Sequence, residues 1–155
     1  MLLLRVIHQF NKYKIPYALV GGHAVALQGA VRGTVDVDFI TTLSKKNLSL
    51  IEKALFEINL TSRLPITPSD LVDFKDEYIK NKNLIAWNFI NINNPTEQID
   101  IIITTDLKEK KIDKIKIKQM TLNVLSKEDL IKMKKKAGRK QDLADVEALE
   151  KLNEK

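Results

Sequence analysis

The stretch Val35-Asp36-Val37-Asp38-Phe39-Ile40 places two aspartates one residue apart in an otherwise apolar run. The run predicts a β-strand over residues 35–41, and a strand sends alternate side chains to opposite faces. Asp36 and Asp38 are therefore expected on one face, about 7 Å apart along the strand. Two like charges at this spacing repel each other and resist burial. The pair therefore indicates a site that holds a cation.

A glycine pair, Gly21-Gly22, is separated from Asp36 by 13 residues. It lies where an apolar strand predicted over 17–20 gives way to a helix predicted over 23–29. Glycine lets the backbone approach a ligand closely. The N–H groups at the start of a helix attract anions. With the aspartates, the pair predicts a metal and phosphate site, and a tight turn is the structural alternative.

A third carboxylate, Asp100, lies in a run of isoleucines over residues 98–103. Aspartate in such a run is unfavourable unless it is paired or binds a metal. If its strand lies beside that of Asp36 and Asp38, three carboxylates converge, which suits two Mg²⁺ ions about 3.5–4 Å apart. Mg²⁺ prefers carboxylate, water and phosphate oxygens. The alternative is a solvated edge strand for the pair and a buried ion pair for Asp100.

Two basic residues near the aspartates are further candidates. His23 follows the glycine pair and could touch a phosphate, although capping or packing is an equal alternative. Arg32 precedes Asp36 by four residues and could neutralise a phosphate or a carboxylate.

The composition is that of one globular domain. The chain has 155 residues, 44% of them hydrophobic and 30% charged. It has no cysteine, which excludes disulfides and thiolate metal sites and fits a reducing, cytoplasmic location. No apolar run reaches the ~18 residues of a membrane span, so no membrane association is expected.

The periodicity predicts an α/β (α+β) fold, a small mixed β-sheet flanked by helices. We expect a core over about residues 1–125 and a helical segment over about 126–155, within a single domain 1–155. Further helices are expected over 3–13, over 45–57 with Ser44 as the cap, from Ser126 and over 140–153. Further strands are expected over 84–92 and 98–104, joined as an antiparallel hairpin by the turn signal Asn93-Asn94-Pro95, with one or two edge strands over 112–125. Residues 61–82 give a weak pattern, with Ser69-Asp70 capping a short helix.

Trp87 and Phe89 are expected in the core, with base stacking as the alternative.

The net charge of +6 is unevenly distributed. Residues 108–140 hold 13 of the 26 basic residues and four acidic ones, a local net charge of +9. A basic sector beside a carboxylate cluster suits a polyanion or a nucleoside triphosphate. A lysine-rich solvated surface is the alternative.

The motifs together resemble a known superfamily. The segment Ala18-Leu19-Val20-Gly21-Gly22-His23-Ala24, followed by Gly29, Arg32, Thr34 and Asp36-Val37-Asp38-Phe39, resembles the first motif of the DNA polymerase beta-like nucleotidyltransferases. Its AbiEii-like branch, from abortive-infection and toxin–antitoxin systems, is the most similar. Residues 125–134 and 137–145 resemble the C-terminal helical motifs of this branch, a lysine-bearing helix followed by Arg-x-x-Asp.

The resemblance implies a minimal nucleotidyltransferase fold and a role for each matching residue. Asp36, Asp38 and Asp100 would hold two Mg²⁺ ions, or Mn²⁺ ions instead. Asp100 would also be the general base. The residues that would bind the nucleotide or its phosphates are Gly21, Gly22, His23, Arg32, Thr34, Lys132, Lys136 and Asp142. Asp142 would orient a lysine or touch the nucleotide, and a solvated helix face is the alternative for the two lysines.

The expected activity is the Mg²⁺-dependent transfer of a nucleoside monophosphate from an NTP, such as ATP, to an acceptor hydroxyl, releasing pyrophosphate. Three acceptors fit: an RNA such as a tRNA 3′ end, a tyrosine of a partner protein, and a small hydroxylated molecule. Many toxins of the branch carry a second helical domain for the acceptor, whereas only two C-terminal helices are expected from this sequence. The alternative function is a catalytically silent module that keeps the fold as a binding scaffold.

Overall fold

The computed structural model describes residues 1–30, 33 and 36–152. These residues form two compact units. Unit 1 comprises Met1–Tyr17 and Phe39–Lys108, and unit 2 comprises Ala18–Asp38 and Glu109–Lys155. The prediction of a single domain stays a prediction.

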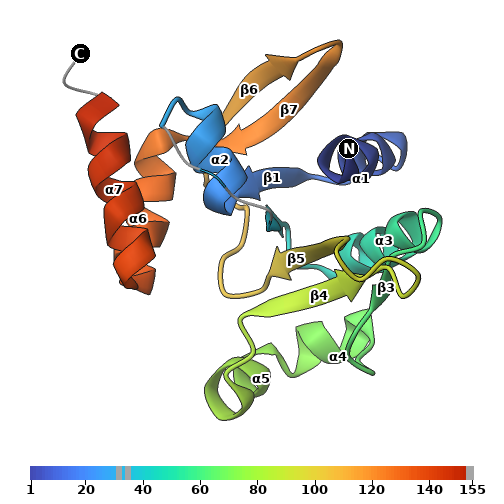
Figure 1. Cartoon of the computed structure of the whole chain (residues 1–155). Coiled ribbons are helices and arrows are strands. Elements are labelled where there is room, and N and C mark those ends of the chain that lie inside the picture. Colours follow the sequence, from blue (N-terminus) through green and yellow to red (C-terminus); the bar gives the residue numbers. More distant parts are fainter. Residues whose placement is uncertain (31–32, 34–35, 153–155) are drawn as a thin grey trace. The chain divides into compact units, whose positions relative to one another are not determined.

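Along the described residues, helices and strands alternate from α1 to β3, and a pair of helices, a run of strands from β4 to β7 and a second pair of helices follow (Figure 1). Their order is α1 (Leu2–Lys12), β1 (Tyr17–Val20), α2 (Gly21–Leu27), β2 (Val37–Thr41), α3 (Lys45–Phe56), β3 (Thr61–Ser62), α4 (Pro68–Asp73), α5 (Lys75–Lys82), β4 (Ala86–Ile90), β5 (Gln98–Ile102), β6 (Ile112–Ile117), β7 (Met120–Leu125), α6 (Lys127–Ala137) and α7 (Lys140–Leu152).

Aromatic side chains form the centre of the core of unit 1. The rings of Phe10, Tyr17 and Phe39 lie with centroids 5.1–5.8 Å apart. Helix α1 supplies Phe10 from its buried face, and α3 packs beside it. Helix α3 begins where expected, because the Ser44 side chain accepts a hydrogen bond from the Asn47 N–H at 3.2 Å.

The predicted hairpin over residues 84–104 is confirmed as the antiparallel pair β4–β5, and β3 pairs with the other side of β4. Trp87 and Phe89 are fully buried, and Trp87 Nε1 donates to Ser62 Oγ at 2.9 Å. Core packing is therefore confirmed for both rings, and neither is exposed to stack on a base.

The weakly patterned segment contains two helices rather than one. The cap is Thr67, not Ser69-Asp70: its side chain accepts from the Asp70 N–H, and the Asp70 carboxylate accepts from the Thr67 N–H. Phe74 then separates α4 from α5.

Unit 2 contains a three-stranded arrangement in the order β1-β7-β6. Strand β7 is parallel to β1, with Leu19 opposite Val124, and antiparallel to β6. The prediction of edge strands over 112–125 is wrong for β7, which lies between two strands. Its buried residues Leu122, Val124 and Leu125 explain why it occupies a central position. Parallel and antiparallel pairs both occur, as expected for a mixed α/β fold.

Two helices, α6 and α7, lie side by side in unit 2 (Figure 1). Ser126 caps α6 by accepting from the Asp129 N–H at 3.2 Å. Gly138 ends α6 in the left-handed conformation, with φ of +66°. Among the described residues, none of the helices combines the length and the hydropathy that crossing a membrane requires.

Candidate functional site

Gly21 and the carboxylate of Asp38 lie in direct contact within unit 2. Strand β1 ends in extended backbone at Val20, and Gly21 turns into α2 with φ of +71°. A Cβ atom added at Gly21 would lie 2.2 Å from Asp38 Oδ2 and 3.1 Å from its Cγ. Glycine is therefore required twice, for its positive φ and for the close approach of the carboxylate.

The two aspartates of the opening motif flank the start of β2. The strand begins at Val37, so Asp36 precedes it instead of lying inside it as predicted. Asp36 is exposed, Val37 is buried, Asp38 is half-buried and Phe39 is buried. This alternation is the one expected when two carboxylates share one face and two apolar side chains enter the core.

A second cluster of charges joins α6 to α7. The guanidinium of Arg139 binds Asp142 with Nε–Oδ2 at 2.6 Å and Nη2–Oδ1 at 3.2 Å. The ammonium of Lys134 lies 3.2 Å from Asp142 Oδ1 and 3.0 Å from Asp145 Oδ2. Two cations and two carboxylates thus form one network, in which both carboxylates and Lys134 are buried.

The electrostatics connect this network to Asp38. The hydrogen bond to Asp142 raises the pKa of Arg139, and the negative charge of Asp38 adds to this effect. Burial alone would raise the pKa of Asp142, but hydrogen bonds from Arg139 and Lys134 outweigh it and lower that pKa. The guanidinium of Arg139 therefore lies within electrostatic range of Asp38.

Arg139 is a further candidate, which was not predicted as a site residue although it begins the Arg-x-x-Asp segment. Its spacing from Asp142 was the available signal, because an aspartate three residues after a helix cap can accept the backbone N–H of the cap. Asp142 Oδ2 accepts from the Arg139 N–H at 3.2 Å. Asp142 thus orients Lys134 and Arg139.

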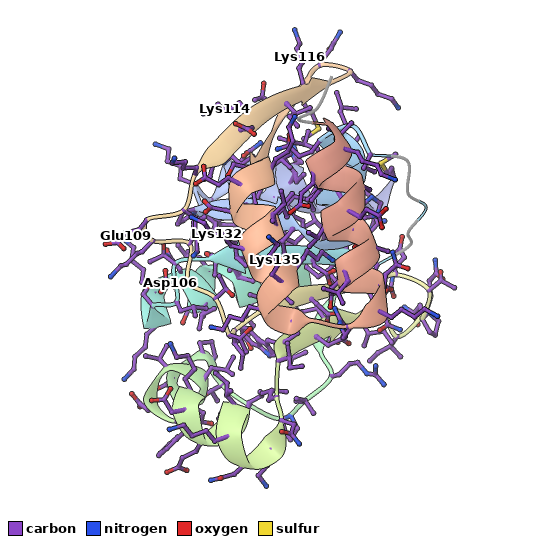
Figure 2. All side chains as sticks on the ribbon, turned by 90° about the vertical axis from the view of Figure 1, so that its left-hand side faces the viewer. Asp106, Glu109, Lys114, Lys116, Lys132 and Lys135 are labelled. Carbon is purple, nitrogen blue, oxygen red and sulfur yellow. The ribbon has the colours of Figure 1, made fainter. Side chains whose placement is uncertain are left out.

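The two predicted phosphate-binding lysines, Lys132 and Lys136, are two residues either side of Lys134. At 3.6 residues per turn they lie roughly 160° around α6 from Lys134. Lys132 is exposed and pairs with Glu128 at 3.4 Å. Figure 2 shows Lys132 and Lys135 along α6 and Lys114 and Lys116 along β6. Lys132 and Lys136 therefore point away from the side of α6 on which Lys134 meets Asp142.

Asp100 lies on β5 in unit 1, opposite Asn88 of β4. Its Oδ1 accepts a hydrogen bond from Asn88 Nδ2 at 2.8 Å. His23 lies half-buried in the first turn of α2. Arg32 and Thr34 lie outside the described residues.

The carboxylates of Asp36 and Asp38 fit Mg²⁺ that is bound together with substrate phosphates. Among the described residues, no group of three or more histidine, cysteine, aspartate or glutamate side chains is placed to hold a metal. Mg²⁺ is usually bound by one or two carboxylates together with water and substrate phosphates. Asp36 and Asp38 can supply the carboxylates, and the close approach of Gly21 to Asp38 leaves the backbone near that carboxylate bare of side chain. The residues thus fit a metal that arrives with a nucleotide.

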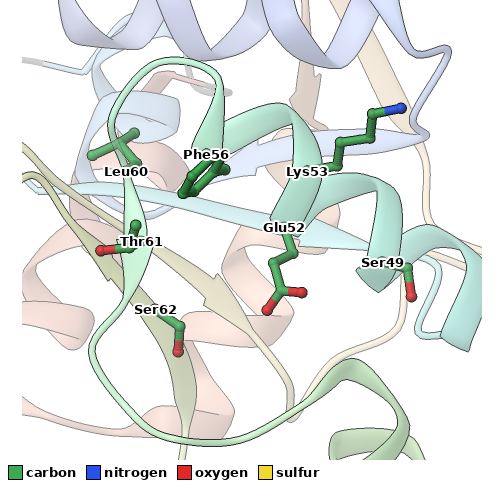
Figure 3. Close-up of a pocket in the computed structure, with 7 residues that line it drawn as sticks. All are labelled: Ser49, Glu52, Lys53, Phe56, Leu60, Thr61 and Ser62. Atoms are coloured by element: carbon green, nitrogen blue, oxygen red, sulfur yellow. The ribbon is translucent and has the colours of Figure 1, made fainter.

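Unit 1 has a separate pocket of about 320 Å³ against α3 and β3 (Figure 3). It is lined by Ser49, Glu52, Lys53, Phe56, Leu60, Thr61 and Ser62. The ring of Phe56 is 68% exposed, although Leu60 beside it is fully buried. The pocket has an apolar wall and hydroxyl groups, and no sequence motif predicts it.

Comparison with known proteins gives a family and a fold. The profile of the family "Nucleotidyltransferase of unknown function (DUF6036)" matches residues 3–154. A sequence search of the curated proteins found no match.

Several solved structures share the fold at low sequence identity. The lincosamide antibiotic adenylyltransferase LnuA, solved with lincomycin, is 15% identical, with a TM-score of 0.64 over 96% of this chain and 94% of LnuA. ANT(2″)-Ia, solved with adenylyl-2″-tobramycin, is 10% identical, with a TM-score of 0.64 over 96% of this chain and 85% of that one. A Thermotoga maritima protein provisionally assigned as a nucleotidyltransferase (TM1012) is 19% identical. Its TM-score is 0.62 over 99% of this chain and 91% of that one. The predicted fold class is confirmed by these likenesses.

Proposed function

The chain belongs to the DUF6036 family of nucleotidyltransferases, and we propose that it moves a nucleoside monophosphate from an NTP to a hydroxyl group of an acceptor. The observation that carries the proposal for this chain is the contact of Gly21 with the Asp38 carboxylate, which a side chain at position 21 would block. The close approach places backbone at the start of α2 next to a carboxylate that can share a metal with phosphate oxygens.

The reaction exchanges one P–O bond for another. The acceptor hydroxyl oxygen attacks the α-phosphorus, and the bond from that phosphorus to the pyrophosphate oxygen breaks. Pyrophosphate leaves with the electron pair of that bond, and the hydroxyl proton passes to a base. Asp36 and Asp38 would hold Mg²⁺, or Mn²⁺ in its place, with the triphosphate. When bound, the metal supplies charge stabilisation at the phosphate oxygens.

Asp100 is the proposed base. The hydrogen bond from Asn88 Nδ2 to Asp100 Oδ1 fixes the orientation of the carboxylate. An oriented carboxylate loses less freedom when it accepts the proton of the acceptor. The roles of Gly22 and His23 near the phosphates, and of Arg32 and Thr34, stay predictions.

The acceptor is a small hydroxylated molecule, an RNA end or a tyrosine of a partner protein. The small-molecule class draws support from two fold neighbours, which were solved with lincomycin and with adenylyl-2″-tobramycin. The RNA class draws support from the lysines of β6 and α6, although Glu128 and Glu150 pair with Lys132 and Lys135. A place in an AbiEii-like toxin–antitoxin or phage-defence system stays a prediction.

The activity is tested by incubating the protein with each α-labelled NTP, Mg²⁺ and either total RNA, cell lysate or a panel of aminoglycosides and lincosamides. Label transferred to any one of these supports the proposal and identifies the acceptor class. If RNA is labelled, its binding should weaken steeply with salt, because counterions are released when lysines contact phosphates. Absence of label in every fraction, together with no thermal stabilisation by any NTP, contradicts the proposal and favours a silent scaffold.

A further inference from the structure

We propose that Arg139 binds the triphosphate of the incoming NTP, exchanging its contact with Asp142 for contacts with phosphate oxygens. This inference rests on the proposed function and adds a residue and a movement to it. Three properties of the described residues carry it: the exposure of the guanidinium, the alternative partners of Asp142 and the neighbourhood of Asp38.

The guanidinium of Arg139 contacts Asp142 with one edge and is accessible to solvent at the other. Its side chain is 76% exposed, whereas that of Asp142 is 1% exposed. The contact with Asp142 uses Nε and Nη2, and a guanidinium has five N–H donors in a planar fork. The remaining donors can meet a ligand in the geometry that suits phosphate oxygens.

Asp142 stays compensated when Arg139 leaves it. A buried carboxylate that loses its only partner is strongly unfavourable. Asp142 keeps the Lys134 ammonium at 3.2 Å and the Arg139 backbone N–H at 3.2 Å. Lys134 is itself fixed by Asp145 at 3.0 Å. The side chain of Arg139 can therefore move without leaving an isolated charge in the interior.

The neighbourhood of Asp38 creates the need for such a cation. Helix α2, which begins at Gly21, packs against α6. Asp36 and Asp38 repel a triphosphate of the same sign, and a cation beside them offsets this repulsion. Lys132 and Lys135 already pair with Glu128 at 3.4 Å and with Glu150 at 3.3 Å. The negative charge of Asp38 acts on the exposed guanidinium of Arg139, whose pKa it helps to raise.

The test compares NTP with NMP binding to the full chain. Calorimetric titrations with Mg-NTP and with NMP are made on wild type, Arg139→Gln and Arg139→Lys, with Lys140→Gln as the matched loss of one neighbouring exposed charge. We expect Arg139→Gln to weaken NTP binding by about tenfold to a hundredfold, the range for a hydrogen-bonded charge. Binding of NMP should stay unchanged, Arg139→Lys should recover part of the loss, and Lys140→Gln should behave as wild type.

A second measurement needs no variant. Phenylglyoxal modifies arginines, and the chain contains Arg5, Arg32, Arg63 and Arg139. Peptide mass spectrometry should show that inorganic tripolyphosphate protects Arg139 but not Arg63. Equal NTP affinity in wild type and folded Arg139→Gln, or no protection of Arg139, overturns the inference while leaving nucleotidyl transfer intact. A wild-type chain that neither binds an NTP nor releases pyrophosphate contradicts the inference and the proposed function together.

Discussion

The backbone of Gly21 faces the carboxylate of Asp38 so closely that a methyl group on Gly21 would lie 2.2 Å from Asp38 Oδ2. No real Cβ atom approaches an oxygen at that distance, so the side chain of Asp38 or the start of α2 would have to move. This contact makes a glycine in a turn and a carboxylate on a strand parts of one site.

Replacing Gly21 with alanine should therefore damage both stability and activity. The positive φ alone is unfavourable for an L-residue by about 1–2 kcal/mol. Displacing Asp38 by about 1 Å should lower nucleotidyl transfer by about a hundredfold. Urea denaturation and pyrophosphate release measure the two effects. Gly33→Ala is the control, because a Cβ there meets nothing within 4 Å, and a similar loss in both variants contradicts this account.

The buried charge network of unit 2 should be a large contributor to stability. Asp142→Asn leaves Lys134 buried with one carboxylate fewer, and breaking a buried pair destabilises a protein by about 3–5 kcal/mol. Glu147→Gln removes an exposed partner of Lys151 from the same helix, which should change stability by no more than about 1 kcal/mol. Equal urea midpoints for the two variants would show that the network contributes little.

The fold was predictable where the periodicity of apolar residues agrees with local signals such as caps, glycines and turns. The glycine pair, the Ser44 cap and the turn at Asn93-Asn94-Pro95 all predict structure because their local chemistry admits few alternatives. The central position of β7 was not predictable, because its pairing with β1 is a long-range contact that the local alternation of apolar residues does not encode. The break at Phe74 has no glycine or proline to signal it.

The site was predictable in part for the same reason. The motif spacing located Gly21, Asp36 and Asp38, whose geometry follows from one strand and one turn. It did not distinguish Lys134 from Lys132 and Lys136, because the four lysines within residues 132–136 differ only in the direction in which α6 turns them. Lys134 is the lysine that is buried against α7, where it pairs with Asp142 and Asp145. The packing of α6 on α7 cannot be read from the sequence of α6 alone.

Acid should remove a stabilising cluster from unit 1. Hydrogen bonds from Tyr13, Gln9 and Lys12 lower the pKa of Glu57 from 4.5 to about 2. Because the folded-state pKa is the lower one, the contribution is present above about pH 4.5 and is lost as pH falls toward 2. Urea midpoints of wild type and Glu57→Gln should differ at neutral pH and converge between pH 4.5 and 2. A difference that is constant over this range contradicts the assignment.

Mg²⁺ should bind well only together with a nucleotide. Asp36 and Asp38 are the proposed ligands, and among the described residues no group of three or more histidine, cysteine, aspartate or glutamate side chains is placed to hold a metal. Phosphate oxygens are therefore needed to complete the coordination. Thermal unfolding should shift little with Mg²⁺ alone and clearly with Mg-NTP, by about 2.7 kcal/mol of unfolding free energy at a hundred times the Kd. Chelation should abolish the shift, and a full shift with the metal alone would contradict this account, because it would require further protein ligands.

The most direct test of the central claim is pyrophosphate release from Mg-NTP and acceptor by Asp38→Asn, compared with wild type and with Asp113→Asn. Asp113 is an exposed carboxylate of β6 that accepts a hydrogen bond from Gln28, so its replacement matches the loss of charge away from the proposed metal. The account predicts a rate at least about a hundredfold lower for Asp38→Asn, an unchanged rate for Asp113→Asn, and folded protein in both. Wild-type rates from a folded Asp38→Asn would contradict the account.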